Sequence, residues 1–134
     1  SEPKYKRENS YERAAWRIEV SPKRPAKEDF FMNVMQVMDN AGKKLIVRKI
    51  EGDKVVGMSL SDRVVFFSKE SEMIDSPITF SIEYKGKYKI LLTDLAPGAW
   101  KVFRNKKIVH SASVVAEDGT LYFEGTEGTY TIKK

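Results

Sequence analysis

After Ala14, apolar and polar residues alternate along most of the chain, as expected for β-strands with one buried face. Turn sequences containing Gly, Asp, Asn or Pro separate these segments. The segments predicted as strands are residues 16–20, 30–38, 45–51, 55–60, 63–68, 78–84, 88–92, 100–102, 108–115, 121–123 and 130–132. Helical periodicity is absent apart from one possible turn at 69–73. About ten strands with little or no helix predict an all-β fold, a β-sandwich of two antiparallel sheets packed face to face.

Two of these segments lead to more specific predictions. The run from Phe30 to Met38 carries apolar residues on both faces, so we expect it in the middle of a sheet with both sides covered. Residues 78–84 and 88–92 alternate regularly on either side of Lys85-Gly86, which predicts a tight hairpin with its turn at Gly86.

The length of 134 residues is typical of one domain with one hydrophobic core. Residues 1–13 are mostly charged or polar and are predicted to be a linker or disordered leader, followed by a single β-sandwich domain at 14–134. Eight residues lie on the apolar side of a predicted strand and are expected to be buried: Trp16, Val34, Phe66, Phe80, Ile90, Leu92, Trp100 and Phe123.

The net charge of +5 is concentrated at the start of the chain. Residues 1–27 hold eight Lys or Arg and four Glu, whereas the other 107 residues hold 16 basic and 15 acidic side chains. A polyanion-binding surface would therefore be made mostly by the leading segment and its neighbours. We interpret these charges as a solvated surface, with polyanion binding as the alternative.

The sequence offers little for catalysis. It contains no Cys and a single histidine, His110, and it lacks the motifs of a serine nucleophile, a phosphate loop or a calcium loop. We predict no catalytic residue, no cofactor and no metal site, with His110 on the surface or at a sheet edge. Two carboxylate pairs, Asp62 with Glu72 and Glu124 with Glu127, are interpreted as loop charges rather than as an acid–base pair.

The aromatic and apolar residues bear on sugar, membrane and nucleic-acid binding. Aromatic rings can stack on sugars, and a platform could combine Tyr84, Tyr88, Tyr122, Tyr130 and Trp100, although most of these lie on the core side of their strands. No apolar run approaches about 18 residues, so no membrane partner is expected. No nucleic-acid partner is expected, because such binding needs aromatic residues interleaved with basic ones on one exposed face, and the basic leader is not arranged in this way.

Five segments together resemble a known family: W-R-I-E-V-S-P at 16–22, D-F-F-M-N-V-M-Q-V at 29–37, D-R-V-V-F-F-S at 62–68, L-L-T-D-L-A-P-G-A-W at 91–100 and G-T-L-Y-F-E-G-T-E-G-T-Y-T-I at 119–132. Over about residues 14–134 the chain is similar to the C-terminal β-sheet domain of the heparinase II/III-like polysaccharide lyases and their relatives. These lyases combine an (α/α) toroid with C-terminal antiparallel β-layers and cleave uronic-acid-containing polysaccharides by β-elimination.

The resemblance implies that this domain has a non-catalytic function. The family's catalytic Tyr, His, Asn and Arg lie in regions that this chain does not match, so no catalytic residue is carried over. The expected role is a secreted module, in a bacterial periplasm or at the cell surface, that packs on and supports an upstream catalytic toroid of the same polypeptide. The alternative is an autonomous carbohydrate-binding module for acidic polysaccharides, and an independent lyase is a more distant one. Possible polysaccharide contacts are Lys23, Arg24, Lys27, Lys85 and Lys87.

Overall fold

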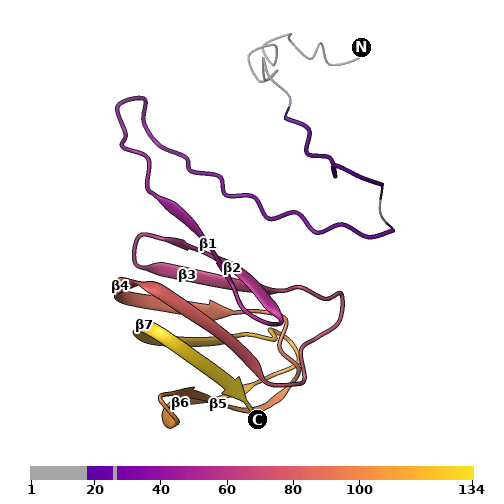
Figure 1. Ribbon diagram of the computed structural model, residues 1–134, viewed down its shortest axis with the longest axis vertical. Helices are drawn as coiled ribbons and strands as arrows, with labels where there is room; N and C mark the ends of the chain where they lie inside the picture. Colours follow the sequence, from indigo (N-terminus) through magenta and orange to yellow (C-terminus); the bar gives the residue numbers. More distant parts are fainter. Residues whose placement is uncertain (1–17, 26) are drawn as a thin grey trace, which may run out of the picture. The chain divides into compact units, whose positions relative to one another are not determined.

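The computed structural model describes residues 18–25 and 27–134. The chain divides into two compact units, Ser1–Asn33 and Val34–Lys134. The described part contains seven strands, all in the second unit, and no helix (Figure 1). The predicted all-β class is therefore confirmed. Trp16 and the predicted 1–13 leader lie outside the described residues, so the burial of Trp16 and the leader's boundary stay predictions.

The seven strands form one hydrogen-bonded sheet in the order β1-β2-β3-β4-β7-β5-β6. All neighbouring pairs are antiparallel except β3 and β4, which are parallel. The strands are β1 (Val47–Glu51), β2 (Val55–Leu60), β3 (Arg63–Ser68), β4 (Ile78–Leu92), β5 (Gly98–Arg104), β6 (Lys107–Val114) and β7 (Leu121–Lys133).

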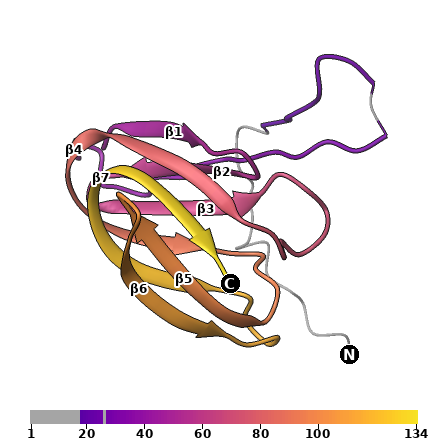
Figure 2. The ribbon, with the colours of Figure 1, turned by 60° about the horizontal axis from the view of Figure 1, so that its bottom comes forward.

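The two long central strands, β4 and β7, pair along almost their whole length and bend together. Their register shifts between Ile82 and Lys87. Gly128 of β7 has a φ of 137°, a backbone conformation that residues other than glycine rarely adopt. Such irregularities increase local bending and twist in a sheet. Strand β3 pairs with the last residues of β4, at Lys89–Leu92, whereas β5 pairs with the last residues of β7. The sheet consequently extends in different directions from the two ends of the central pair (Figure 2).

The bend folds the sheet over a single core. Phe66 of β3 lies 4.1 Å, ring centroid to ring centroid, from Phe80 in the first part of β4, and Tyr130 of β7 contacts both Phe80 and Phe123. Backbone pairing between Gly52 and Phe80 joins the end of β1 to the start of β4. One curved sheet thus encloses the core that the sequence assigned to two separate sheets.

The predicted hairpin at Lys85-Gly86 is wrong. The chain runs through Gly86 without reversing, and β4 is one strand of 15 residues. In the same way, 121–123 and 130–132 are parts of one strand, β7, and the segment around Gly125 is not a loop. These two mergers, together with the absence of strands in the described residues before Val47, reduce about ten predicted strands to seven.

The buried set is otherwise well predicted. Six of the eight residues are buried in the core: Phe66, Phe80, Ile90, Leu92, Trp100 and Phe123. Val34 is a wrong prediction, because 37% of it is exposed. The segment 30–38 is not a covered central strand but extended chain without ladder pairing in the described structure. Its apolar residues have no sheet to pack on within the second unit.

Candidate functional site

Two surfaces of the second unit are chemically distinctive, and the first lies on the outer side of β5 and β7. Trp100 and Val102 of β5 and Tyr130 and Ile132 of β7 point into the core, so the residues between them face outward. We call this surface the cationic face and define it by the following residues: Lys101, Phe103, Asn105, Lys106, Thr129, Thr131 and Lys133. Cross-strand pairing places Phe103 opposite Thr131 and Lys101 opposite Lys133.

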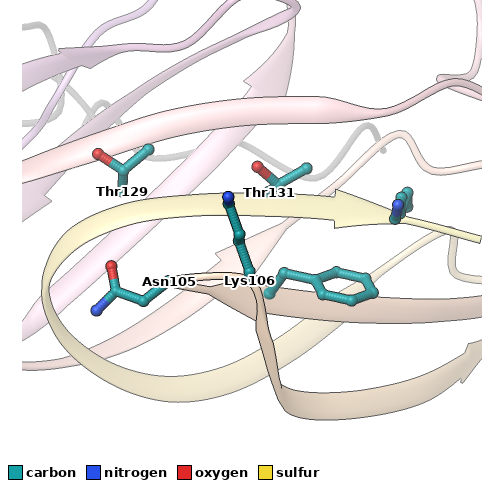
Figure 3. Close-up of a pocket in the computed structure, with 6 residues that line it drawn as sticks. Asn105, Lys106, Thr129 and Thr131 are labelled. Carbon is teal, nitrogen blue, oxygen red and sulfur yellow. The ribbon is translucent and has the colours of Figure 1, made fainter.

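A shallow, open hollow of about 430 Å³ occupies the centre of the cationic face. It is lined by Phe103, Asn105, Lys106, Thr129, Thr131 and Lys133. Figure 3 shows Thr129 and Thr131 on the same side of β7, with the Lys106 side chain extending from the β5–β6 turn toward that strand. The Nζ atom of Lys133 lies 4.9 Å from the centre of the Phe103 ring, within the range of a cation–π contact. Ammonium groups, hydroxyls and a side-chain amide thus line one hollow beside an aromatic ring.

The tight turn between β5 and β6 carries Lys106 to this position. Arg104 and Lys107 pair across the turn, which leaves Asn105 and Lys106 as its two central residues. Both have positive φ, 51° for Asn105 and 64° for Lys106. A two-residue hairpin turn requires this geometry, and Asn tolerates it, but the second position usually holds Gly. Lysine at this position is therefore held in an unfavourable backbone conformation.

No acidic residue occurs in β5, the β5–β6 turn, β6 or the end of the chain from Gly128, which together contain six Lys or Arg. Two of these six have intramolecular partners: Arg104 donates to the backbone oxygen of Glu127, and Lys134 pairs with Asp75. Among the described residues, Lys101, Lys106 and Lys107 make no ion pair, and Lys133 contacts only the Phe103 ring. The cationic face therefore presents positive charge that this unit does not neutralise.

The second distinctive surface is an arm at residues 34–46, which leads into β1 (Figure 1). The amide of Gln36 holds its two limbs together: Nε2 donates to the Leu45 oxygen at 3.0 Å, and Oε1 accepts from the Leu45 nitrogen at 2.9 Å. At the tip, Gly42 N donates to Asp39 O at 2.7 Å. A single side chain thus takes the place of a strand ladder.

The arm exposes a large apolar surface. Met35 is 87% and Val37 is 91% exposed, and Val34, Met38, Leu45 and Ile46 are also exposed. Scattered apolar residues on a surface are ordinary, but a contiguous set of this size marks an interaction site. The backbone of residues 34–38 is extended and takes part in no strand ladder in the described structure. Such a segment is suited to strand addition on another sheet.

One comparison with known proteins covers the strands that follow the arm in the sequence. The family model described as Heparinase II C-terminal domain matches residues 49–134, which is more than half of the chain. The chain belongs to this family. A search of curated proteins gives no match. The match begins inside β1, so the heparinase II C-terminal domain comprises almost the whole seven-stranded sheet and the cationic face, while the arm precedes it.

The five lysines and arginines predicted to contact polysaccharide lie in both units. Lys85 and Lys87 are exposed on β4 of the heparinase II C-terminal domain, and Lys23, Arg24 and Lys27 are exposed in the first unit. Their role as polysaccharide contacts stays a prediction. The sequence did not predict the cationic face, because charge was compared between residues 1–27 and the other 107 residues, and the latter are nearly neutral as a whole. The available signal was the lack of Asp and Glu over residues 98–114 and 128–134.

The structure separates the predicted tyrosine and tryptophan platform. Tyr84 and Tyr122 are each 49% exposed, whereas Tyr88, Tyr130 and Trp100 are buried. The Tyr122 hydroxyl donates to Glu124 at 2.9 Å, and this hydrogen bond raises the pKa of Tyr122 above its ordinary value. The platform therefore does not exist as one surface.

His110, Asp62 and Glu127 each have different partners. His110 lies on the edge strand β6, as predicted, with its ring 6.1 Å from that of Phe123. Asp62 pairs with Arg63 and Lys89, each at 3.9 Å, while Glu127 accepts a hydrogen bond from Gly86 N. Within residues 18–25 and 27–134, no three His, Asp or Glu side chains are grouped to hold a metal ion. The same part of the chain has no helix able to span a membrane.

Proposed function

We propose that this chain is a non-catalytic C-terminal module of a secreted heparinase II/III-like polysaccharide lyase and that it packs on the upstream catalytic domain. The family match supports the C-terminal position. The sequence supports the lack of catalysis, because it has no Cys, one His and none of the nucleophile motifs. Secretion to a periplasm or cell surface rests on the family resemblance.

The exposed arm carries the packing role. Exposure of Met35 and Val37 to water is unfavourable, because burial of a large apolar side chain lowers the free energy by roughly 1.5–3 kcal/mol. The arm lies immediately before the family's domain, where the chain would enter the preceding domain. The extended arm can lie along the surface of that domain, with Met35, Val37 and Ile46 buried in the contact.

The test measures binding between this chain and the catalytic domain of its own polypeptide, prepared as separate proteins. Replacing Met35 and Val37 with Asp is expected to weaken the complex by at least about tenfold in Kd, since charges enter an apolar contact. The thermal stability of the chain should not change, because both side chains are exposed. Isothermal titration calorimetry and thermal unfolding provide the two measurements.

Val115→Asp is the matched control, because Val115 is an apolar residue of the same unit, 49% exposed and outside the arm. It should bind like the wild type. Equal binding by the arm variant would refute the docking role, as would a stable dimer of the 134-residue chain that the arm variant dissociates.

A second candidate function is binding of acidic polysaccharide by this module. The charge distribution favours it, because residues 98–114 and 128–134, which form β5, β6, the turn between them and the end of the chain, hold six basic residues and no acidic one. Retention of the whole chain on a heparin column, beyond that on a sulfonate cation exchanger, is the first measurement. Equal elution from both columns would exclude specific binding.

A further inference from the structure

We propose that the cationic face is the site at which this module binds an acidic polysaccharide chain, with the sulfate or carboxylate groups of the sugar in the hollow beside Lys106 and Lys133. The inference rests on the second candidate function above and assigns it to particular residues. It differs from the sequence-based prediction, which used Lys23, Arg24, Lys27, Lys85 and Lys87.

The first argument is the arrangement of charge. Lys101 and Lys133 are direct cross-strand partners, and like charges in this relation destabilise a sheet. No carboxylate of the described residues pairs with either of them. An anionic group bound between or above these lysines would remove the repulsion and gain charge-assisted hydrogen bonds.

The second argument is the backbone of the β5–β6 turn. Lys106 is held at a φ of 64°, where glycine would be less strained. This conformation directs its ammonium group to the hollow rather than away from the sheet (Figure 3). Backbone strain of this kind is found at functional sites, where the position of a side chain matters more than local stability.

The third argument is the chemistry of the other lining residues. Thr129, Thr131 and Asn105 provide hydroxyl and amide groups that can donate to and accept from sugar hydroxyls. The Phe103 ring offers an apolar surface for sugar C–H groups. Nucleic acid is a poorer fit, since single-strand binding uses several exposed aromatic rings in series and this face has one. The ammonium groups, the hydroxyl and amide groups and the aromatic ring of the hollow therefore match the anionic groups, the hydroxyls and the C–H groups of an acidic sugar.

The experiment titrates the whole 134-residue chain with four probes: a heparin octasaccharide, a hyaluronan octasaccharide, neutral maltooctaose and a single-stranded DNA oligonucleotide. We expect binding of one or both acidic probes, with affinity that falls as salt rises, and no binding of maltooctaose. Heparin alone would indicate sulfate recognition, whereas equal affinity for hyaluronan would indicate carboxylate recognition. Lys106→Ala combined with Lys133→Ala should weaken the bound probe by about tenfold or more.

Lys101→Glu is the second variant. It places a carboxylate opposite Lys133, so a new cross-strand ion pair should preserve or raise the unfolding temperature while affinity for the acidic probe falls. Lys43→Ala combined with Lys44→Ala is the control of equal charge loss: both lie in the arm, without an ion pair among the described residues, and binding should change less than twofold, about the scatter of an affinity measurement.

The outcomes distinguish whether the module binds acidic polysaccharide from whether the cationic face is the place where it binds. Failure of the wild type to bind either acidic probe would overturn both the second candidate function and this site, and would leave the docking role untouched. Binding that survives Lys106→Ala/Lys133→Ala and Lys101→Glu would keep the function but place its site elsewhere. Equal losses in the Lys43/Lys44 control, or equally tight binding of single-stranded DNA, would reduce the effect to general attraction by positive charge.

Discussion

At the scale of single residues, Trp100 is the largest fully buried side chain of the described core. Its side chain is 1% exposed, and its indole Nε1 donates to the Ala96 oxygen at 2.8 Å. The ring therefore contributes apolar burial and also satisfies a backbone group in the loop before β5. Its neighbours in the core include the other fully buried aromatic residues, Phe66, Phe80, Phe123 and Tyr130.

Trp100→Ala is expected to lower the free energy of unfolding by about 3–5 kcal/mol, because it leaves a cavity and an unpaired carbonyl. Trp100→Phe retains most of the apolar contact and should cost less. Chemical denaturation of the three proteins measures both differences. An alanine variant with the wild-type midpoint would contradict the burial of this ring and would return Trp100 to the group of possible sugar contacts.

At the scale of elements, the bend of β4 and β7 is held by Glu127. Its Oε2 atom accepts from the backbone nitrogen of Gly86 at 3.1 Å, and the Arg104 side chain donates to its backbone oxygen. The hydrogen bond from Gly86 is the main cause that lowers the pKa of Glu127 below its ordinary value of 4.5. A carboxylate thus connects the two strands at the place where their register shifts.

This contact predicts a pH dependence of stability. Because the pKa of Glu127 is lower in the folded than in the unfolded protein, its contribution is present above pH 4.5 and is lost as the pH falls through the folded-state value. Glu127→Gln cannot titrate. Between about pH 5 and about pH 3 the unfolding temperature of the wild type should therefore fall further than that of the variant. Parallel curves would show that this carboxylate is not coupled to folding.

The same bend explains why part of the fold could not be predicted. Lys85-Gly86 and the glycines between 125 and 128 have the composition of turns, and alternation on either side suggests separate strands. The structure instead keeps both strands continuous, since they pair with each other on both sides of the bend and Gly128 takes the positive φ there. Local sequence shows that the chain can bend there, but pairing between residues far apart decides that it does not reverse.

At the scale of the whole molecule, folding separates charges that are mixed along the sequence. After residue 27 the chain has 16 basic and 15 acidic residues, yet all 15 acidic residues lie outside the segments 98–114 and 128–134. Those segments form neighbouring strands β5, β6 and the end of β7, so six basic residues gather at one end of the sheet. A nearly neutral body therefore has a strongly positive side.

At the same scale, we predict that the isolated chain has no lyase activity. Incubation with heparan sulfate, chondroitin or alginate should give no increase in unsaturated-uronate absorbance, because the sequence contains none of the nucleophile motifs and matches none of the family's catalytic motifs. The complete polypeptide, with its proposed catalytic domain, is the positive control. An increase that persists through repurification and depends on this chain would contradict the non-catalytic assignment.

The sequence by itself determined the all-β class and six of the buried residues, because alternation with a period of two directly reflects which side of a strand meets the core. The resemblance to the heparinase II/III-like family was also correct, and three of its five motifs, at 62–68, 91–100 and 119–132, lie in the residues that the family model matches. Tertiary structure alone decided that one bent sheet replaces two, that Val34 is exposed, and that Lys101, Lys106 and Lys133 share a face. Each of these depends on which distant segments pair, and pairing between distant strands leaves no periodic signal in the local sequence.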